Sequence, residues 1–473
     1  MPGSVELMLA NQIYISKEGL PPVLKNKLIR LAAFQNPEFY KAQAMRFPTY
    51  DKPRIVHCCE DFPKHIGLPI GCLGDIFELL HSLGIKTEVI DERFAEVPIN
   101  ARFIGELRPE QQVAADALLR HDTGVLAAST AFGKTVVAAY LIAKRSVNTL
   151  IMVHLKELLY QWIARLNTFL DVSVDDIGQF GGGKRKPTGI IDVATIQSLG
   201  RKGVVDDIVA KYGYLIVDEC HHISARSFEI VARQCKAKYV TGLSATVTRK
   251  DGHHPIIFMN CGHVRYKVDD KKQAAARPFA HEVIVRETSF RMPASFEADQ
   301  YTAIHEIYKS LLQSDERNKV IVADVMLAIK NNRFPVILTE RVEHLETLKN
   351  LLEDKITNLI VMKGGMGKKQ RQAALNALEF LPDDAEKAVL ATGRYLGEGF
   401  DDERLDTLFL TLPISWRGTL NQYAGRLHRI YDSKKKVVIY DYADLNVPVL
   451  ARMYDRRLKG YRSLGYEIKD DNS

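Results

Sequence analysis

The stretch that decides the fold is Gly124-Val125-Leu126-Ala127-Ala128-Ser129-Thr130-Ala131-Phe132-Gly133-Lys134-Thr135. It passes from an apolar strand into a loop and then into a helical pattern. The loop matches the phosphate-loop spacing G-x-x-x-x-G-K-T, except that Ala128 stands in the first glycine position. Backbone N–H groups of such a loop, with the N-terminus of the helix that follows, bind phosphate oxygens. We therefore expect a nucleotide to be bound by Ala128, Ser129, Thr130, Ala131, Phe132, Gly133, Lys134 and Thr135.

Two side chains of this loop have specific expected roles. The Lys134 ammonium should reach the β and γ phosphates of ATP, and the Thr135 hydroxyl should ligate Mg²⁺. ATP and Mg²⁺ are therefore the predicted cofactors.

An acidic pair follows a second apolar strand. The run Leu215–Val217 leads directly into Asp218-Glu219-Cys220-His221. Ligands bind at the carboxyl ends of strands in open α/β sheets, which places both acids at such an edge. We expect Asp218 to hold magnesium and Glu219 to polarise the attacking water. The pair alone is equally compatible with a solvated strand end, and the phosphate loop upstream favours the catalytic interpretation.

The spacing of apolar runs predicts an α/β fold with parallel sheets. Each run is separated from the next by enough residues for a crossover helix. In the segment 105–277 the runs are Gly124–Ala127, Thr149–Val153, Ile190–Ala194, Tyr214–Val217 and Tyr239–Thr241. In the segment 278–473 they are Pro335–Leu338, Asn358–Met362, Ala388–Ala391, Thr407–Leu412 and Val437–Tyr440. Two successive parallel-sheet domains are therefore predicted.

The remaining segments differ from these domains in composition and in the spacing of their apolar residues. Residues 1–104 read as a small mixed α/β accessory domain. Lys267–Arg277 is charged and alanine-rich, which is typical of an interdomain linker. Gly181–Lys186 reads as a flexible basic loop.

Composition narrows the class of protein. Of 473 residues, 46% are hydrophobic and 26% charged, as in ordinary globular proteins. No apolar run approaches the roughly 20 residues of a membrane span, and the first residues lack the features of a secretory signal. Six cysteines without a C-x-x-C pair favour a reducing, cytoplasmic setting over a disulfide framework. The net charge of +7 is weak support for a nucleic-acid partner.

Asp218–His221 resembles motif II of superfamily 2 helicases, in a DEAD/DEAH-box variant, and seven further stretches fall in that family's order. They are the adenine-reading segment Leu107–Gln111, motif Ia in Val153–Trp162, the strand-contacting Ala194–Ser198, motif III in Gly242–Thr246, motif IV in Leu338–Arg341, motif V in Ala391–Asp401 and motif VI in Gln422–Arg429. Within the family, the sequence is similar to the XPB-like and phage branch-migration-like groups. It also resembles the helicase parts of bacterial primase–helicase conflict systems.

The resemblance implies two tandem RecA-like domains with ATP between them. The catalytic residues it implies are Lys134, Asp218, Glu219, Gln422, Arg426 and Arg429, with Arg426 and Arg429 three apart on one helix face. Further nucleotide contacts are expected from Arg108, Gln111, Gly399 and Asp401. The expected nucleic-acid contacts are Lys156, Thr195, Gln197, Thr339, Arg341, Gly365 and Thr392.

Three functions remain open from the sequence. The favoured one is an ATP-dependent DNA helicase or translocase, 3′ to 5′ by resemblance, acting on duplex, forked or branched DNA, with single-stranded, forked or branched DNA as its expected partner. The alternatives are a motor module that serves a primase or nuclease partner, and, less favoured, an RNA helicase. One departure from the family bears on ATP affinity. Ala131 replaces a usual glycine, and a methyl group is tolerated there only if the residue avoids positive φ.

Overall fold

The computed structural model describes residues 2–94, 97–129, 131–201, 204–221, 225–246, 251–293, 304–393, 402–414 and 417–469. Their contacts divide the chain into two compact units. The first comprises Met1–Ala128 and Phe132–Val268, and the second comprises Ser129–Ala131 and Asp269–Ser473. Among the described residues, no helix is long and apolar enough to cross a membrane.

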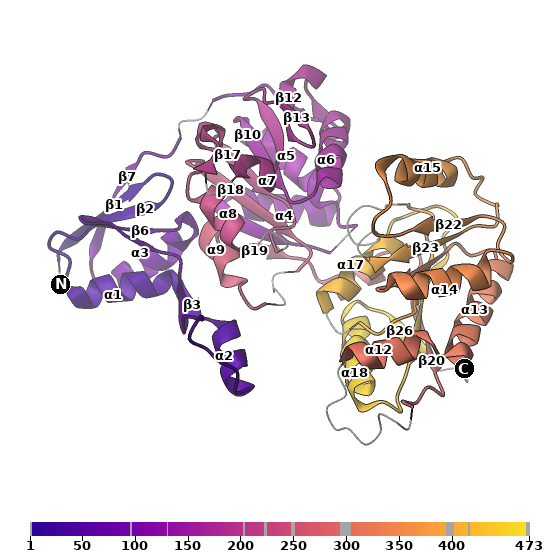
Figure 1. The fold of residues 1–473 in the computed structure, drawn as a ribbon. Coiled ribbons are helices and arrows are strands. Elements are labelled where there is room, and N and C mark those ends of the chain that lie inside the picture. The colour runs from indigo at the N-terminus through magenta and orange to yellow at the C-terminus, as the bar shows by residue number, and fades with distance from the viewer. Residues whose placement is uncertain are drawn as a thin grey trace. The chain divides into compact units, whose positions relative to one another are not determined.

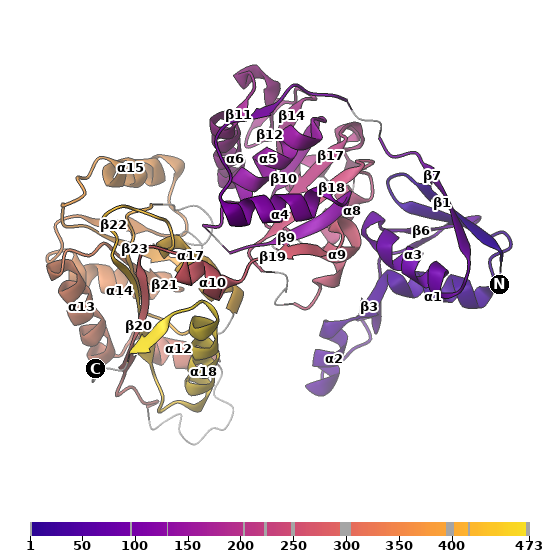
Figure 2. The same cartoon turned by 180° about the vertical axis from the view of Figure 1, so that it is seen from behind.

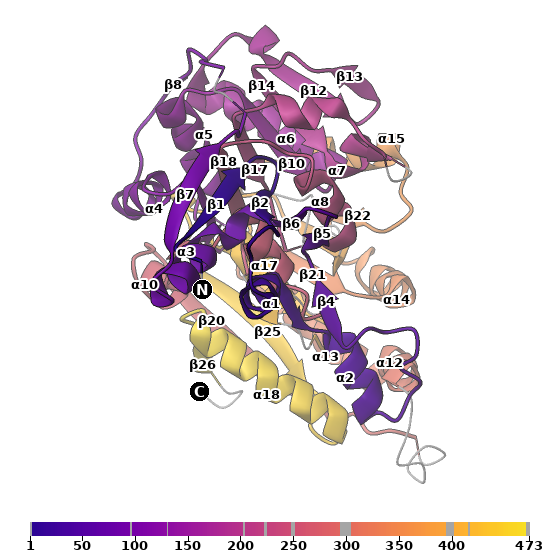
Figure 3. The same cartoon turned by 90° about the vertical axis from the view of Figure 1, so that its left-hand side faces the viewer.

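The first unit begins with a five-stranded sheet in the order β5-β6-β2-β1-β7 (Figure 3). β1 and β7 are parallel, and the other neighbours are antiparallel. Alternate residues of β1 are buried, as expected for a strand with one face on a core. The elements of this region are β1 (Ser4–Leu9), β2 (Ile13–Ser16), α1 (Pro22–Leu31), β3 (Ala33–Gln35), α2 (Pro37–Ala44), β4 (Ile55–His57), β5 (Glu60–Asp61), β6 (His65–Leu68), η1 (Ile70–Cys72), α3 (Leu73–Ser82) and β7 (Lys86–Asp91).

This small sheet packs against the helix α9 (Pro255–Cys261). Ile256 and Met259 of that helix belong to the same buried cluster as the strands of the sheet. A Cβ at Gly71 would lie 2.3 Å from the Phe258 carbonyl oxygen, so only glycine allows η1 to approach so closely. The ion pair Arg233–Glu60, at 2.6 Å, adds a polar contact to the same interface. The N-terminal sheet is therefore held to the rest of the first unit.

The main sheet of the first unit has eight strands in the order β13-β12-β14-β10-β17-β18-β9-β19 (Figure 1). All neighbours are parallel except β12 and β13. The strands are β9 (Thr123–Ala127), β10 (Thr149–Val153), β12 (Ile177–Gly181), β13 (Lys184–Lys186), β14 (Ile191–Thr195), β17 (Tyr214–Val217), β18 (Tyr239–Ser244) and β19 (Val264–Lys267). The helices are α4 (Pro109–Leu119), α5 (Lys134–Arg145), α6 (Lys156–Phe169), α7 (Ile196–Leu199), α8 (Ala225–Ala232) and α9. Short pieces complete the unit: β8 (Arg102–Phe103), β11 (Leu170–Asp171), η2 (Val174–Asp176), β15 (Gly200–Arg201), β16 (Val204–Val205) and η3 (Asp207–Lys211).

The prediction that Gly181–Lys186 forms a flexible loop is wrong. The segment closes a hairpin in which β13 pairs antiparallel with β12 at the sheet edge. Gly181, Gly182 and Gly183 all have positive φ, which allows the chain to reverse within two residues. The glycines form the turn of a hairpin, and the basic residues after them form its outer strand.

The second unit has a seven-stranded sheet in the order β22-β23-β21-β24-β25-β20-β26 (Figure 2). Every neighbouring pair is parallel. The strands are β20 (Ala280–Glu287), β21 (Pro335–Thr339), β22 (Leu359–Met362), β23 (Ala388–Thr392), β24 (Thr407–Leu410), β25 (Lys436–Ala443) and β26 (Glu467–Lys469). The helices are α10 (Asp270–Ala275), α12 (Ile304–Leu312), α13 (Asp315–Lys330), α14 (Val342–Leu352), α15 (Lys368–Glu379), α17 (Arg417–Leu427) and α18 (Pro448–Ser463). Helix α10 lies inside the segment predicted as a linker.

These two sheets confirm the predicted fold class of tandem RecA-like α/β domains with an additional N-terminal α/β region. The predicted strands are present with small changes in their ends. Their residues are mostly buried on both faces, because helices cover both sides of a parallel sheet.

Candidate active site

The phosphate loop joins β9 to α5. Gly133 is the N-cap of α5 and has φ +88°. A Cβ at this position would lie 2.4 Å from Gln111 Nε2, so both the backbone conformation and the space require glycine. Helix α5 then begins at Lys134, which directs its N-terminal N–H groups at the loop.

Ala131 occupies a strained backbone conformation. Its φ is +73°. This value lies in the left-handed region, where we expected a methyl group not to be tolerated. A side chain with a Cβ costs about 1–2 kcal/mol in that region. The expected condition for tolerating a methyl group is therefore not met, and the loop keeps this strain.

Replacing this alanine by glycine should relieve the strain. We expect Ala131→Gly to raise the free energy of unfolding by about 0.5–1 kcal/mol, since the strain removed exceeds the added entropy of the unfolded chain. Ala143→Gly, inside α5, is the control and should lower it by about 1 kcal/mol. Urea denaturation of both variants tests this, and equal losses in the two would contradict the strain at residue 131.

The acidic pair lies at the end of β17, beside Lys134. Lys134 Nζ lies 3.1 Å from Glu219 Oε1 and donates to the Ala128 carbonyl at 3.1 Å. Glu219 has φ +43°, a second non-glycine residue with left-handed backbone in this site. The sequence prediction that these residues converge is consistent with this geometry, because β9 and β17 end at the same sheet edge.

Asp218 is buried and held from two directions. Its Oδ2 accepts a hydrogen bond from Trp162 Nε1 at 2.7 Å, and its Oδ1 accepts one from the Glu219 N–H at 3.0 Å. Burial raises the pKa of Asp218 to about 6, and the neighbouring Glu219 carboxylate contributes in the same direction. Trp162, on α6, was not predicted as a site residue.

A polar chain connects the acidic pair to the end of β18. His221 Nδ1 lies 3.3 Å from Glu219 Oε2 and 2.8 Å from Ser244 Oγ. The Ala245 N–H donates to Glu219 Oε2 at 3.3 Å, and Ser244 Oγ donates to the Thr246 carbonyl. The water-activating candidate is thus linked directly to the segment Gly242–Thr246.

Gln111 and Arg108 contact the phosphate loop. Gln111 Nε2 donates to the Phe132 carbonyl at 2.7 Å, and Arg108 Nη2 donates to the same oxygen. The Arg108 N–H donates to Gln111 Oε1 at 2.9 Å, which closes the first turn of α4. Both side chains therefore support the loop backbone in this structure.

The residues present fit Mg²⁺–ATP. A phosphate-bound Mg²⁺ takes only one or two protein oxygens, because phosphates and waters supply the others. Thr135 and Asp218 are a hydroxyl and an oriented carboxylate of this kind. No cluster of three metal-ligating side chains occurs among the described residues, so their acids and histidines do not form a separate all-protein metal cage.

Three predicted nucleic-acid residues lie together in the first unit. Thr195 Oγ1 lies 2.7 Å from Ser198 Oγ, and Gln197 Nε2 donates to the His154 carbonyl at 3.1 Å. A Cβ at Gly182 would meet Lys156 Cε at 3.0 Å, which places the turn of the β12–β13 hairpin against Lys156. Lys184–Lys186 at the end of this hairpin are exposed. The structure thus groups Lys156, Thr195 and Gln197 with a basic hairpin.

The predicted contacts of the second unit gather at the ends of β21 and β23. Thr339 and Thr392 are register partners on these strands. Tyr423 Oη donates to Glu340 Oε1 at 2.7 Å, so motifs IV and VI are in direct contact. Arg341 stacks its guanidinium 5.8 Å from the Tyr308 ring centroid. Gly365 lies in the loop after β22, and a Cβ at this position would meet no atom within 4 Å.

Thr339 is held by a buried neutral histidine. His344 Nδ1 lies 3.1 Å from Thr339 Oγ1, and His344 Nε2 lies 3.0 Å from Asn318 Oδ1. Burial lowers the pKa of His344 to about 3, with a further contribution from the Arg317 charge. The hydrogen bonds that hold Thr339, at the end of β21, therefore require His344 to be uncharged.

This histidine should make the protein sensitive to acid. The unfolded chain binds a proton at His344 near pH 6.5, whereas the folded chain binds it only near pH 3, so stability is full above pH 6.5 and falls as the pH falls. The loss attributable to His344 is about 2 kcal/mol at pH 5. We expect His344→Gln to reduce the difference in unfolding free energy between pH 7.5 and pH 5 by that amount. The control is His305→Gln, at an exposed position on α12. An unchanged difference in His344→Gln would contradict the assignment.

Motif VI departs from the prediction in one respect. Helix α17 ends at Leu427, so Arg429 does not share a helix face with Arg426. Gln422 and Arg426 lie on the helix, and Arg429 lies two residues beyond its end. The reason is the buried Lys434, whose Nζ donates to the Leu427 carbonyl at 3.0 Å and to the Arg429 carbonyl at 2.9 Å. These carbonyls are bound by the lysine where a longer helix would use its own N–H groups.

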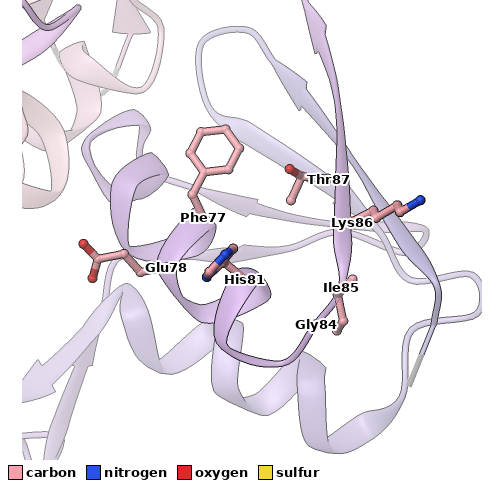
Figure 4. A pocket seen from close by; sticks show the side chains of 7 residues that line it. All are labelled: Phe77, Glu78, His81, Gly84, Ile85, Lys86 and Thr87. Carbon is pink, nitrogen blue, oxygen red and sulfur yellow. The ribbon is translucent and has the colours of Figure 1, made fainter.

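Three predicted nucleotide residues, Thr130, Gly399 and Asp401, lie outside the described residues. The N-terminal sheet contains a hollow of about 770 Å³ between α3 and β7 (Figure 4). Phe77, Glu78, His81, Gly84, Ile85, Lys86 and Thr87 line it. None of the predicted site residues belongs to this lining.

Comparison with known proteins gives related sequences. Residues 104–249 match the family model described as type III restriction enzyme, res subunit. A putative ATP-dependent RNA helicase of Acanthamoeba polyphaga mimivirus is 24% identical over 389 residues, which cover 79% of this chain and 71% of the relative. A DNA 3′-5′ translocase, XPB2, of Sulfurisphaera tokodaii is 33% identical over 162 residues, which cover 34% of this chain and 36% of that protein.

A solved structure agrees with the fold. The ATP-dependent type ISP restriction-modification enzyme LlaBIII, solved bound to DNA, superposes with a TM-score of 0.54 at 14% identity. The match covers 77% of this chain and 31% of the enzyme. This likeness concerns the arrangement of helices and strands.

Proposed function

We propose that the chain, an ATP-hydrolysing helicase of superfamily 2 in the XPB-like and phage-helicase-like group, is a DNA translocase or helicase that moves 3′ to 5′. The observation that carries the proposal is the connected set Lys134, Glu219, His221 and Ser244. It joins the phosphate loop to Ser244 at the end of β18, and we propose that hydrolysis is transmitted to the rest of the motor along this connection.

Each residue of the ATP site has a proposed role. Lys134 binds the β and γ phosphates, and Gly133 and the N-terminus of α5 present N–H groups to them. Thr135 and Asp218 hold Mg²⁺, which neutralises charge on the phosphates when it is bound. Glu219 orients and accepts a proton from the attacking water. From the second unit, Gln422, Arg426 and Arg429 stabilise the negative charge that develops during hydrolysis.

Nucleic acid is proposed to bind through its phosphates. Lys156, Thr195 and Gln197 in the first unit, and Arg341 and Thr392 in the second, supply hydroxyl, amide and cationic donors at strand ends and helix starts. Thr339 is buried and its hydroxyl donates to His344, so its proposed role is to position the end of β21. The exposed basic hairpin Lys184–Lys186 adds positive charge beside the first group. Such contacts favour binding that depends on salt and little on base sequence.

DNA is proposed over RNA because of the translocase relative, which is the more similar of the two over the region it covers. The mimivirus relative, named as an RNA helicase, keeps an RNA substrate as a weaker candidate. A second candidate function is a DNA-stimulated motor for a nuclease or primase partner. The match of residues 104–249 to a restriction-enzyme subunit supports it.

Stimulation of ATP hydrolysis tests the substrate. Initial rates would be measured with single-stranded, duplex, forked and branched DNA and with RNA, at equal phosphate concentration and fixed salt. The proposal expects stimulation by DNA well above that by RNA, with affinity that falls steeply as salt rises. Stimulation by RNA alone would overturn the DNA assignment. Strand displacement with and without a nuclease or primase would separate the two DNA functions.

A further inference from the structure

A buried lysine binds three backbone carbonyls at the end of motif VI. Lys434 Nζ donates to the carbonyls of Glu403 at 2.7 Å, Leu427 at 3.0 Å and Arg429 at 2.9 Å. These three bonds use all three protons of the ammonium group. The residue is only 6% exposed. One side chain therefore ties the segment before β24 to the end of α17.

Burying a charged amine costs free energy unless hydrogen bonds compensate for the lost water. The three carbonyls bound by Lys434 provide that compensation. Burial lowers the pKa of Lys434 to about 8, against the opposing effect of Asp406, Asp402 and Glu403, while Arg333 adds to the lowering. The Phe279 ring, with its centroid 5.6 Å from Nζ, covers the amine. The Leu427 carbonyl it binds lies at the C-terminal end of α17, and the Arg429 carbonyl lies just beyond it, where a helix leaves its last carbonyls without N–H partners of its own.

We propose that Lys434 is a positioning residue for ATP hydrolysis, which fixes the backbone of Leu427 and Arg429 and so sets where the Arg429 side chain begins. The inference rests on the proposed role of Arg429 in hydrolysis. Arg429 lies beyond the last helical residue, so α17 does not fix its backbone by itself. The lysine supplies that restraint through the Arg429 carbonyl.

The restraint should act on turnover and only weakly on ATP binding. The bonds of Lys434 are to backbone carbonyls of the second unit, and the lysine has no role in the proposed ground-state phosphate contacts. A displacement of about 1 Å in a group that stabilises a transition state costs on the order of 10²-fold in rate. Loss of Lys434 should therefore lower kcat and leave KM for ATP nearly unchanged.

The chain offers a matched control in Lys387. Its Nζ also donates to two carbonyls, those of Pro382 at 2.7 Å and Asp383 at 3.1 Å, and it is 3% exposed. It lies 5.3 Å from the centroid of another aromatic ring, that of Phe334. Its carbonyls belong to the loop after α15, which carries none of the proposed catalytic residues.

The test is a set of steady-state ATPase measurements on the full chain with saturating DNA. The variants are Lys434→Met, Lys434→Arg, Lys387→Met, Arg429→Ala and Lys434→Met with Arg429→Ala. We expect Lys434→Met to lower kcat about 10–100-fold with KM changed less than about threefold, and Lys434→Arg to restore part of the loss. Lys387→Met should lower the thermal midpoint and leave kcat unchanged. In the Arg429→Ala background, Lys434→Met should add no further loss.

The outcomes separate the two proposals. If Arg429→Ala has normal kcat, the proposed role of Arg429 fails, and the inference about Lys434 fails with it. If Arg429→Ala is impaired and folded Lys434→Met is not, only the inference is overturned. If Lys434→Met does not fold, Lys434→Arg decides, alone and combined with Arg429→Ala. A partial loss of turnover that disappears in the Arg429→Ala background supports the inference, and a loss that adds to that of Arg429→Ala overturns it.

Discussion

A Lys134→Ala variant is expected to lose ATP hydrolysis, by at least about 10²–10³-fold, because the alanine removes the ammonium group proposed to bind the β and γ phosphates. In the structure Lys134 Nζ lies 3.1 Å from both the Ala128 carbonyl and the Glu219 carboxylate. The charge is therefore already centred between the loop and the acid that would activate water. The measurement is phosphate release at saturating ATP and DNA.

A matched control lies on the same helix. Lys144 is exposed near the end of α5, with its ammonium 5.3 Å from the Tyr140 ring centroid. Lys144→Ala makes the same change in charge and should keep hydrolysis within about twofold of the parent. Hydrolysis by Lys134→Ala at the rate of the Lys144→Ala control would contradict the phosphate-loop assignment.

An Arg429→Ala variant is expected to lower turnover on the order of 10³-fold, on the general scale of arginine residues that stabilise the transition state of phosphoryl transfer. ATP affinity should weaken far less, because Lys134 and the phosphate loop make the proposed ground-state contacts. The measurement pairs kcat with the dissociation constant of ATP.

The control for this prediction is Arg452→Ala, at an exposed position on α18. It should have parental kcat and ATP affinity. Normal DNA-stimulated hydrolysis by Arg429→Ala would remove Arg429 from the catalytic set. It would leave Arg426 as the candidate arginine of motif VI.

The sheets could be predicted because their strands are buried on both faces. Runs such as Thr149–Val153 and Ala388–Thr392 are apolar throughout or nearly so, and they stand out between helical segments. β1 and β20 were not predicted, although alternate residues of both strands are buried, which is the pattern of a strand with one face on a core. The β12–β13 hairpin was missed because three glycines and three basic residues resemble a loop, although a sheet edge accepts them.

The phosphate loop and the acidic pair could be predicted from short-range patterns. Their supporting contacts could not, because they join residues far apart in the chain. Trp162 and Asp218 are 56 residues apart, and Glu340 and Tyr423 are 83 apart. Lys434 carries no motif, and only its three carbonyl partners reveal it. Backbone strain at Ala131 and Glu219 likewise appears only in the fold.

Displacement of streptavidin from biotinylated single-stranded DNA tests most directly whether hydrolysis at the Lys134–Glu219 site drives movement along DNA. The account predicts ATP-dependent displacement from the 5′ end that is much faster than from the 3′ end. Glu219→Gln should bind ATP and DNA and displace nothing, because it lacks the group that activates water. Displacement by Glu219→Gln at the parental rate, or an ATPase-active parent protein that displaces streptavidin from neither end, would contradict the account.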